Sequence, residues 1–164
     1  MAQMSLPIVA DWANPTAAGQ LDRALRVFRE LVEKKYQARE VQIGHPQDVA
    51  DLVADEMSLY EQEILRVFLL DTRNRVIKSV DVVKGSVNSA QVRIAELFRD
   101  AIRYTATAII LAHNHPSGDP TPSPDDIALT RQAAKAGELL DIAVLDHLVI
   151  GGGRWVSLKA QGYF

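Results

Sequence analysis

Two histidines at the end of a strongly apolar segment are the residues best placed to do chemistry in this sequence. His113 and His115 are two positions apart and directly follow the apolar run Thr107–Ala112. In an extended chain such residues point to the same side. Neutral imidazoles are good zinc ligands, a carboxylate can be a third ligand, and the fourth tetrahedral position is then open to water. Zinc lowers the pKa of that water to about 7, so hydroxide becomes available at neutral pH.

The segment that follows also has a purely structural interpretation. An isolated His-x-His is more often a strand-end pair than a metal site. Ser123 is a good helix N-cap, Pro124 suits the first helical position, and two acidic residues follow in the first turn. The contiguous string His-Asn-His does not indicate a nuclease, because the nuclease motif of that name spreads its residues over a longer ββα element. Helix capping does not explain why all these features lie together just after the end of the most apolar predicted strand.

The composition excludes several other kinds of site. The chain has 164 residues, no cysteine and a formal net charge of −3. The lack of cysteine excludes disulfides, thiol nucleophiles and cysteine-ligated metals, including the zinc-deaminase site. The acidic balance gives no general attraction to DNA, RNA or anionic membranes. We see no signal peptide and no apolar run near the roughly 18 residues of a membrane span, so we expect a cytoplasmic protein.

Hydrophobic periodicity predicts helices and strands in a mixed order. Helices are expected over 17–37, from Pro46 to about Tyr60, from about Ser89 to Tyr104, and from Pro124 to about Leu140. Strands are expected over Ile64–Leu70, Arg75–Val83, Thr107–Ala112, Ile142–Leu145, His147–Ile150 and Arg154–Leu158. This order indicates an α/β fold of three layers with a mixed sheet. We expect residues 1–40 to form a tail and an amphipathic helix, and residues 41–164 to form the main domain.

The spacing His-x-His-x7-Ser-x2-Asp, formed by His113, His115, Ser123 and Asp126, resembles the JAMM signature of MPN+ proteins. More narrowly, several segments resemble the RadC-type JAB domain of bacteria, and together they cover roughly residues 46–162: HNHPSGDPTPSPDD, LTRQAAKAGELLDIAVLDHLVIG, EQEILRVFLLDTRNRVIKSV and KGSVNSAQV. The resemblance implies a cytidine-deaminase-like α/β/α fold. It also implies a zinc ion held by His113, His115 and Asp126.

The resemblance implies roles for residues beyond these ligands. Glu63 matches the family's glutamate that holds the zinc-bound water and shuttles its proton, with Glu61 as the alternative. Ser123 is expected to donate a hydrogen bond to the oxyanion. Asp146 and His147 match a family-typical pair, which either orients the zinc ligands through hydrogen bonds or joins two strands. Of these two roles, the structural one is favoured.

The chain also departs from the family pattern. Many RadC domains carry His-Pro-Arg-Glu where this sequence has Arg93-Ile94-Ala95-Glu96. The helix-hairpin-helix segment that often precedes the domain is not evident. In its place is the amphipathic helix 17–37, which either caps the core or forms the interface of a homodimer.

These features predict a zinc metallopeptidase, a hydrolase that cleaves a peptide or isopeptide amide bond in a peptide or protein substrate. The family name links it nominally to DNA repair, but the composition does not support DNA binding. The alternative is a non-catalytic JAB-fold interaction module in repair or recombination machinery, with a structural zinc. A metal-dependent nuclease is a third hypothesis.

Overall fold

The computed structural model describes residues 17–37, 40–85 and 92–164. Within these residues the helices are α1 (Ala17–Gln37), α2 (Pro46–Met57), α3 (Ile94–Arg103) and α4 (Pro124–Leu140). The strands are β1 (Ile64–Leu70), β2 (Val76–Lys84), β3 (Ala108–Asn114), β4 (Ala143–Gly151) and β5 (Arg154–Ser157).

The strands form one mixed sheet in the order β2-β1-β3-β4-β5. β1 pairs antiparallel with both β2 and β3, and β5 pairs antiparallel with β4. β3 and β4 are parallel, as expected for strands that a helix connects, and here the connecting helix is α4. β1 and β3 lie inside the sheet and are buried along their whole length, which explains why their sequences are almost continuously apolar.

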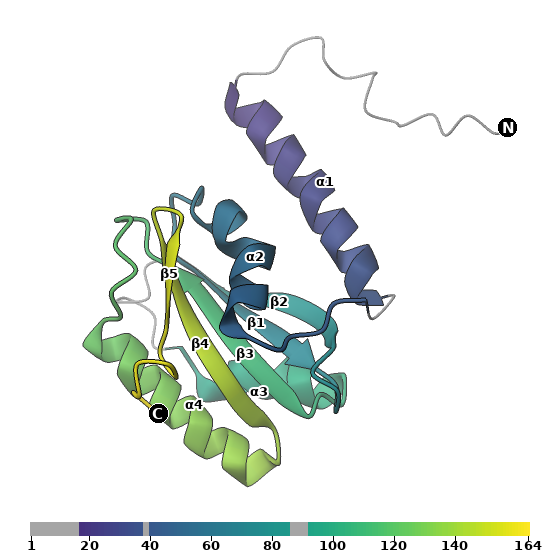
Figure 1. Cartoon of the computed structure of the whole chain (residues 1–164), viewed down its shortest axis with the longest axis vertical. Helices are drawn as coiled ribbons and strands as arrows, with labels where there is room; N and C mark the ends of the chain where they lie inside the picture. The colour runs from purple at the N-terminus through teal and green to yellow at the C-terminus, as the bar shows by residue number, and fades with distance from the viewer. Residues whose placement is uncertain (1–16, 38–39, 86–91) are drawn as a thin grey trace, which may run out of the picture.

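Helices cover both faces of this sheet, with α1 and α2 on one side and α3 and α4 on the other (Figure 1). Alternate residues of β1 serve the two layers: Phe68 packs on the α2 side, whereas Val67 and Leu69 pack on the α3 side. The predicted three-layer α/β/α architecture with a mixed sheet is therefore confirmed.

The last long strand differs from the prediction. The sequence suggested two segments that meet near Asp146, but β4 runs unbroken from Ala143 to Gly151. The register with β3 shifts here, because Ile109 pairs with Val144 whereas Ile110 pairs with Asp146. Leu145 is thus the extra residue of a β-bulge, which explains why the alternation of side chains is interrupted in the sequence.

Two helix boundaries also differ from the prediction within the described residues. α2 ends at Met57 rather than near Tyr60, and a turn follows in which Tyr60 N donates to Met57 O. α3 begins at Ile94, because Arg93 has extended backbone angles and occupies the N-cap. The predicted start at Ser89 lies outside the described residues.

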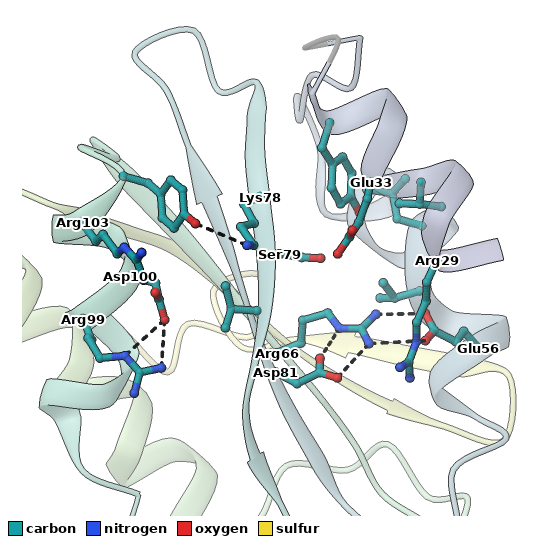
Figure 2. Close-up of a pocket in the computed structure, with 16 residues that line it drawn as sticks. Arg29, Glu33, Glu56, Arg66, Lys78, Ser79, Asp81, Arg99, Asp100 and Arg103 are labelled. Carbon is teal, nitrogen blue, oxygen red and sulfur yellow. Dashed lines mark hydrogen bonds and ion pairs between the residues drawn. The ribbon is translucent and has the colours of Figure 1, made fainter. Parts of the chain in front are cut away.

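A buried charged cluster joins both helices of the α1/α2 layer to the edge of the sheet. Arg66 of β1, which is 6% exposed, binds Glu56 of α2 at 2.9 Å and Asp81 of β2 at 2.6 Å. Arg29 of α1 contacts the same Glu56 carboxylate and the Tyr60 hydroxyl. Figure 2 shows this cluster in the wall of a cavity of about 400 Å³ beside β2. Buried charges are tolerated only when they are paired, so the cluster fixes how these elements meet.

The amphipathic helix α1 packs on the domain through one side of its C-terminal half. Tyr36 is 2% exposed within the core of the α2 layer, and Val32 packs against the same core. Leu21, Phe28 and Leu31 remain exposed. A separate unit for residues 1–40 stays a prediction. Among the described helices, none combines the length and the apolar character that crossing a membrane requires.

We predict that Gly137→Ala destabilises the fold. A Cβ atom at this position would lie 2.4 Å from Ile142 O, a backbone atom of the α4–β4 connection that cannot move aside cheaply. We expect a loss of about 1–3 kcal/mol, measured as a lower midpoint of denaturant unfolding. Gln132→Ala, at an exposed position of the same helix, is the control and should leave the midpoint nearly unchanged. Equal midpoints for the two variants would contradict the close packing at Gly137.

Candidate metal centre

The geometry of a strand end places the two histidines on one side of the sheet. β3 includes His113, which is 1% exposed, and the extended backbone continues beyond it because His115 N donates to Ile150 O at 2.7 Å. The Nε2 atoms of the two imidazoles lie 3.0 Å apart. Asn114, between them, points to the other side, as strand alternation requires.

The first turn of α4 brings a carboxylate to these imidazoles. Asp126 is 2% exposed, with its two carboxylate oxygens 3.2 Å from His113 Nε2 and 3.4 Å from His115 Nε2. Ser123 is the N-cap: its Oγ accepts a hydrogen bond from Asp126 N at 3.2 Å. Asp126 Oδ2 accepts bonds from Ser123 N at 2.7 Å and from Ser123 Oγ at 2.6 Å. The helix cap therefore also orients the candidate ligand.

The candidate base comes from the opposite side of the site. Leu65 pairs with His113 in the antiparallel register of β1 and β3, so continuing that register places Glu63 opposite His115. Glu63 Oε1 lies 3.9 Å from His113 Nε2, and its side chain is 15% exposed. Asn114 holds the residues on either side of Glu63 by two hydrogen bonds. Its Oδ1 accepts from Ile64 N at 2.8 Å, and its Nδ2 donates to Gln62 O at 3.1 Å. Glu61 is exposed and does not join the cluster.

Four side chains thus converge, and their candidate ligand atoms all lie within 4.8 Å of one another: Glu63, His113, His115 and Asp126. His115 Nδ1 donates to the carbonyl oxygen of Asp119 at 2.8 Å, since a carbonyl can only accept. The lone pair of a neutral His115 is therefore on Nε2, which faces the Asp126 carboxylate and the other imidazole. These four side chains could therefore hold a metal ion, and imidazoles and carboxylates are among the ligands that zinc takes.

The electrostatics favour positive charge at the centre of this cluster. The hydrogen bond that a protonated His115 would donate to Asp126 raises the pKa of His115, although partial burial opposes the shift. Burial raises the pKa of Asp126, but its interactions with the His113 and His115 imidazoles, which would donate to it when protonated, outweigh burial and hold that pKa well below the usual range. Asp126 is consequently ionised at neutral pH, as a metal ligand must be.

The side chains of Asp146 and His147 lie on opposite faces of the sheet. Asp146 lies on the α2 side and accepts from Ser157 Oγ at 2.6 Å and from Lys159 N at 3.2 Å, so it joins β4 to β5 and the chain that follows. His147 lies on the α4 side, where its Nε2 is 2.8 Å from His113 Nδ1. Of the two residues, only His147 touches a candidate ligand.

Two residues at this site were missed in the sequence. Thr130 Oγ1 lies 2.6 Å from His147 Nδ1 and donates to Asp126 O at 2.6 Å. Its position one helical turn after Asp126 could have indicated that both face the site. Asn114, which holds the segment of Glu63, lies between the histidines and could have been recognised as a polar residue on a fully buried strand. The roles predicted for Glu63, Ser123, His113, His115 and Asp126 stay predictions, but the structure brings all five together.

A mixed five-stranded sheet between two layers of helices is consistent with a JAB/MPN domain. The model of the RadC-like JAB domain family matches residues 43–163, so the chain belongs to this family. The match includes all the site residues described above and excludes α1.

Similar curated proteins carry the name UPF0758 protein. The one from Roseiflexus castenholzii is 54% identical over 143 residues, which are 87% of this chain and 61% of that protein. The one from Chloroflexus aurantiacus is 49% identical over 154 residues, or 94% of this chain and 64% of that protein. One from Clostridium botulinum is 44% identical over 146 residues, or 89% and 64%. This chain therefore spans roughly three fifths of the length of these relatives.

We predict that Gly151→Ala weakens metal binding without altering a ligand. A Cβ atom there would lie 2.8 Å from the carbonyl carbons of Gly118 and Asp119, so the loop must shift and carry the Asp119 oxygen away from His115. We expect a loss of about tenfold in zinc affinity, measured by competition with a chelator. Gly137→Ala is the control, since it crowds the other end of α4 and should lower stability while sparing zinc affinity. Unchanged zinc affinity in Gly151→Ala, together with reduced affinity in Gly137→Ala, would show that this loop does not orient His115.

Proposed function

We propose that this chain is a zinc-dependent hydrolase that cleaves a peptide or isopeptide amide bond. The observation that carries the proposal is the convergence of three buried or half-buried ligands with a fourth, partly exposed carboxylate from another element. A closed structural site needs four protein ligands that surround the metal. In this proposal His113, His115 and Asp126 provide three, and Glu63 acts on the water at the fourth position.

The three ligands would hold a zinc ion, which when bound polarises a carbonyl and activates water for attack. Glu63 differs from Asp126 in both exposure and place: its side chain is 15% exposed against 3%, and it precedes β1 rather than opening α4. The more exposed Glu63 could therefore reach an incoming substrate, whereas the buried Asp126 would serve as a ligand. Glu63 takes the proton from the attacking water and delivers it to the leaving amine.

Ser123 supplies a hydrogen bond to the developing oxyanion in this proposal. Its single hydroxyl proton is donated to Asp126 Oδ2 at 2.6 Å. With Asp126 engaged as a ligand, its carboxylate would be a weaker acceptor and the Ser123 hydroxyl would be free to turn towards substrate. The backbone bond from Ser123 N to Asp126 Oδ2 does not depend on the hydroxyl, so the carboxylate stays oriented during this rotation.

The ligand assignment predicts the metal content of the purified protein. We expect about one zinc per chain by elemental analysis, and loss of the metal in His113→Ala and Asp126→Ala, because each removes one of three ligands. Asp125→Ala is the matched control, since Asp125 is an exposed acid in the same helical turn. Zinc retained in Asp126→Ala, or lost equally in Asp125→Ala, would refute the assignment.

The role of Glu63 predicts that Glu63→Gln abolishes turnover while the fold and the zinc remain. The amide keeps the shape of the side chain but cannot accept a proton, and loss of a general base costs about 10²–10⁴ in rate. The measurement is hydrolysis of a panel of peptide and isopeptide substrates, with Glu61→Gln as the matched control.

The same pair of variants separates an enzyme from an interaction module with a structural zinc. An enzyme loses activity in Glu63→Gln but not in Glu61→Gln. If zinc-loaded protein hydrolyses no member of the panel, or if Glu63→Gln is as active as the unaltered chain, the hydrolase proposal is wrong.

A further inference from the structure

A hydrogen-bonded chain of buried groups connects the backbone of one candidate ligand to the imidazole ring of another. It runs from Asp126 O to Thr130 Oγ1 at 2.6 Å, then to His147 Nδ1 at 2.6 Å, and from His147 Nε2 to His113 Nδ1 at 2.8 Å. Thr130 and His147 are both 0% exposed, and His113 is 1% exposed. No solvent reaches these groups, so each proton in the chain has only the neighbouring group as a partner.

The chemistry of its ends fixes the direction of every bond in this chain. The Asp126 carbonyl can only accept, so the single proton of the Thr130 hydroxyl is directed at it. Thr130 Oγ1 then accepts from His147, which places a proton on His147 Nδ1. Complete burial disfavours a charged imidazolium, so His147 Nε2 carries a lone pair and accepts from His113 Nδ1.

The remaining nitrogen of His113 is consequently the one that faces the metal site. With a proton on Nδ1, a neutral His113 has its lone pair on Nε2, which lies 3.2 Å from Asp126 Oδ1 and 3.0 Å from His115 Nε2. For His115 a single hydrogen bond has the same effect: Nδ1 donates to the Asp119 carbonyl, so the lone pair of the neutral ring is on Nε2. Both imidazoles therefore present Nε2, and in each case the direction is set by a backbone carbonyl.

We propose that Thr130 and His147 are positioning residues that hold His113 in the tautomer able to bind zinc through Nε2. This inference rests on the proposed function, since it assigns a role towards the zinc of that site. It adds that the third ligand, Asp126, contributes twice: its carboxylate binds the metal, and its carbonyl orients the first ligand through Thr130 and His147.

The β-bulge at Leu145 supports this role independently. His147 pairs with Leu111, two residues before His113, so its side chain lies on the same face as His113. Without the extra residue, His147 would pair with Ala112 and point into the α2 layer. Bulges interrupt the ladder and are commonly found where a side chain must be re-aimed near a site. Here the side chain that is re-aimed is His147.

Thr130→Val tests the proposal, because valine keeps the volume and shape of threonine but lacks the hydroxyl. Without the hydroxyl nothing fixes the proton of His147, so its two tautomers mix and His113 is no longer held with Nε2 free. We expect zinc affinity to fall about tenfold by chelator competition. Thr130→Ser keeps the hydroxyl and should retain the affinity of the unaltered chain, which separates the hydrogen bond from packing.

Nitrogen NMR of the imidazole rings in the unaltered protein provides a readout that does not depend on a variant folding. We expect protons on Nδ1 of both His113 and His147, with and without zinc. A proton on Nε2 of His147 would overturn the proposal, as would unchanged zinc affinity in folded Thr130→Val. If the unaltered chain binds no zinc, the proposed function fails. The tautomers of His113 and His147 in the metal-free protein then still decide whether the hydrogen bonds run in the direction described here.

Discussion

The pairing register of β3 with its two neighbours is the constraint on which the candidate centre depends. On one side, Leu65 pairs with His113, which brings Glu63 alongside the histidines. On the other side, Leu111 pairs with His147, which brings that imidazole onto the same face. A slip of one residue in either pairing would turn these side chains to the opposite layer. The apolar residues of β1 and β3 prevent such a slip, because it would exchange the sets that pack on the two helical layers.

The start of α4 uses the same residues for the helix cap and for the candidate metal group. Ser123 and Asp126 satisfy each other's backbone N–H groups, as in any capping box. Those hydrogen bonds also fix the direction of the Asp126 carboxylate towards His113 and His115. A helix cap and a ligand are therefore not competing explanations of this segment. A capped helix that begins at a strand mouth is a rigid means of holding a carboxylate against two imidazoles.

The sequence predicted the features that depend on a local residue pattern. It did not predict the features that depend on how the strands pair. Continuous apolar runs predicted β1 and β3, and the motif spacing predicted which of its residues lie together. The bulge at Leu145 could not be foreseen, because it depends on pairing with β3 rather than on local preference. Without it, the sequence could not show which of the adjacent residues Asp146 and His147 faces which layer. Thr130 was missed for a related reason, since its partner His147 is distant in the chain.

The sheet separates two polar networks, although Asp146 and His147, which belong to different networks, are adjacent in the sequence. On the α4 side, the side chains of His113, Asp126, Thr130 and His147 form one network; on the α2 side, Asp146 and Ser157 form another. Among the described residues no buried side-chain polar atom lacks a hydrogen-bond partner, so each network is complete by itself. Buried polar groups are costly when left unpaired, and a change in one member is felt mainly by its own network. Asp146 therefore supports the strand that carries His147, whereas His147 acts directly on a candidate ligand.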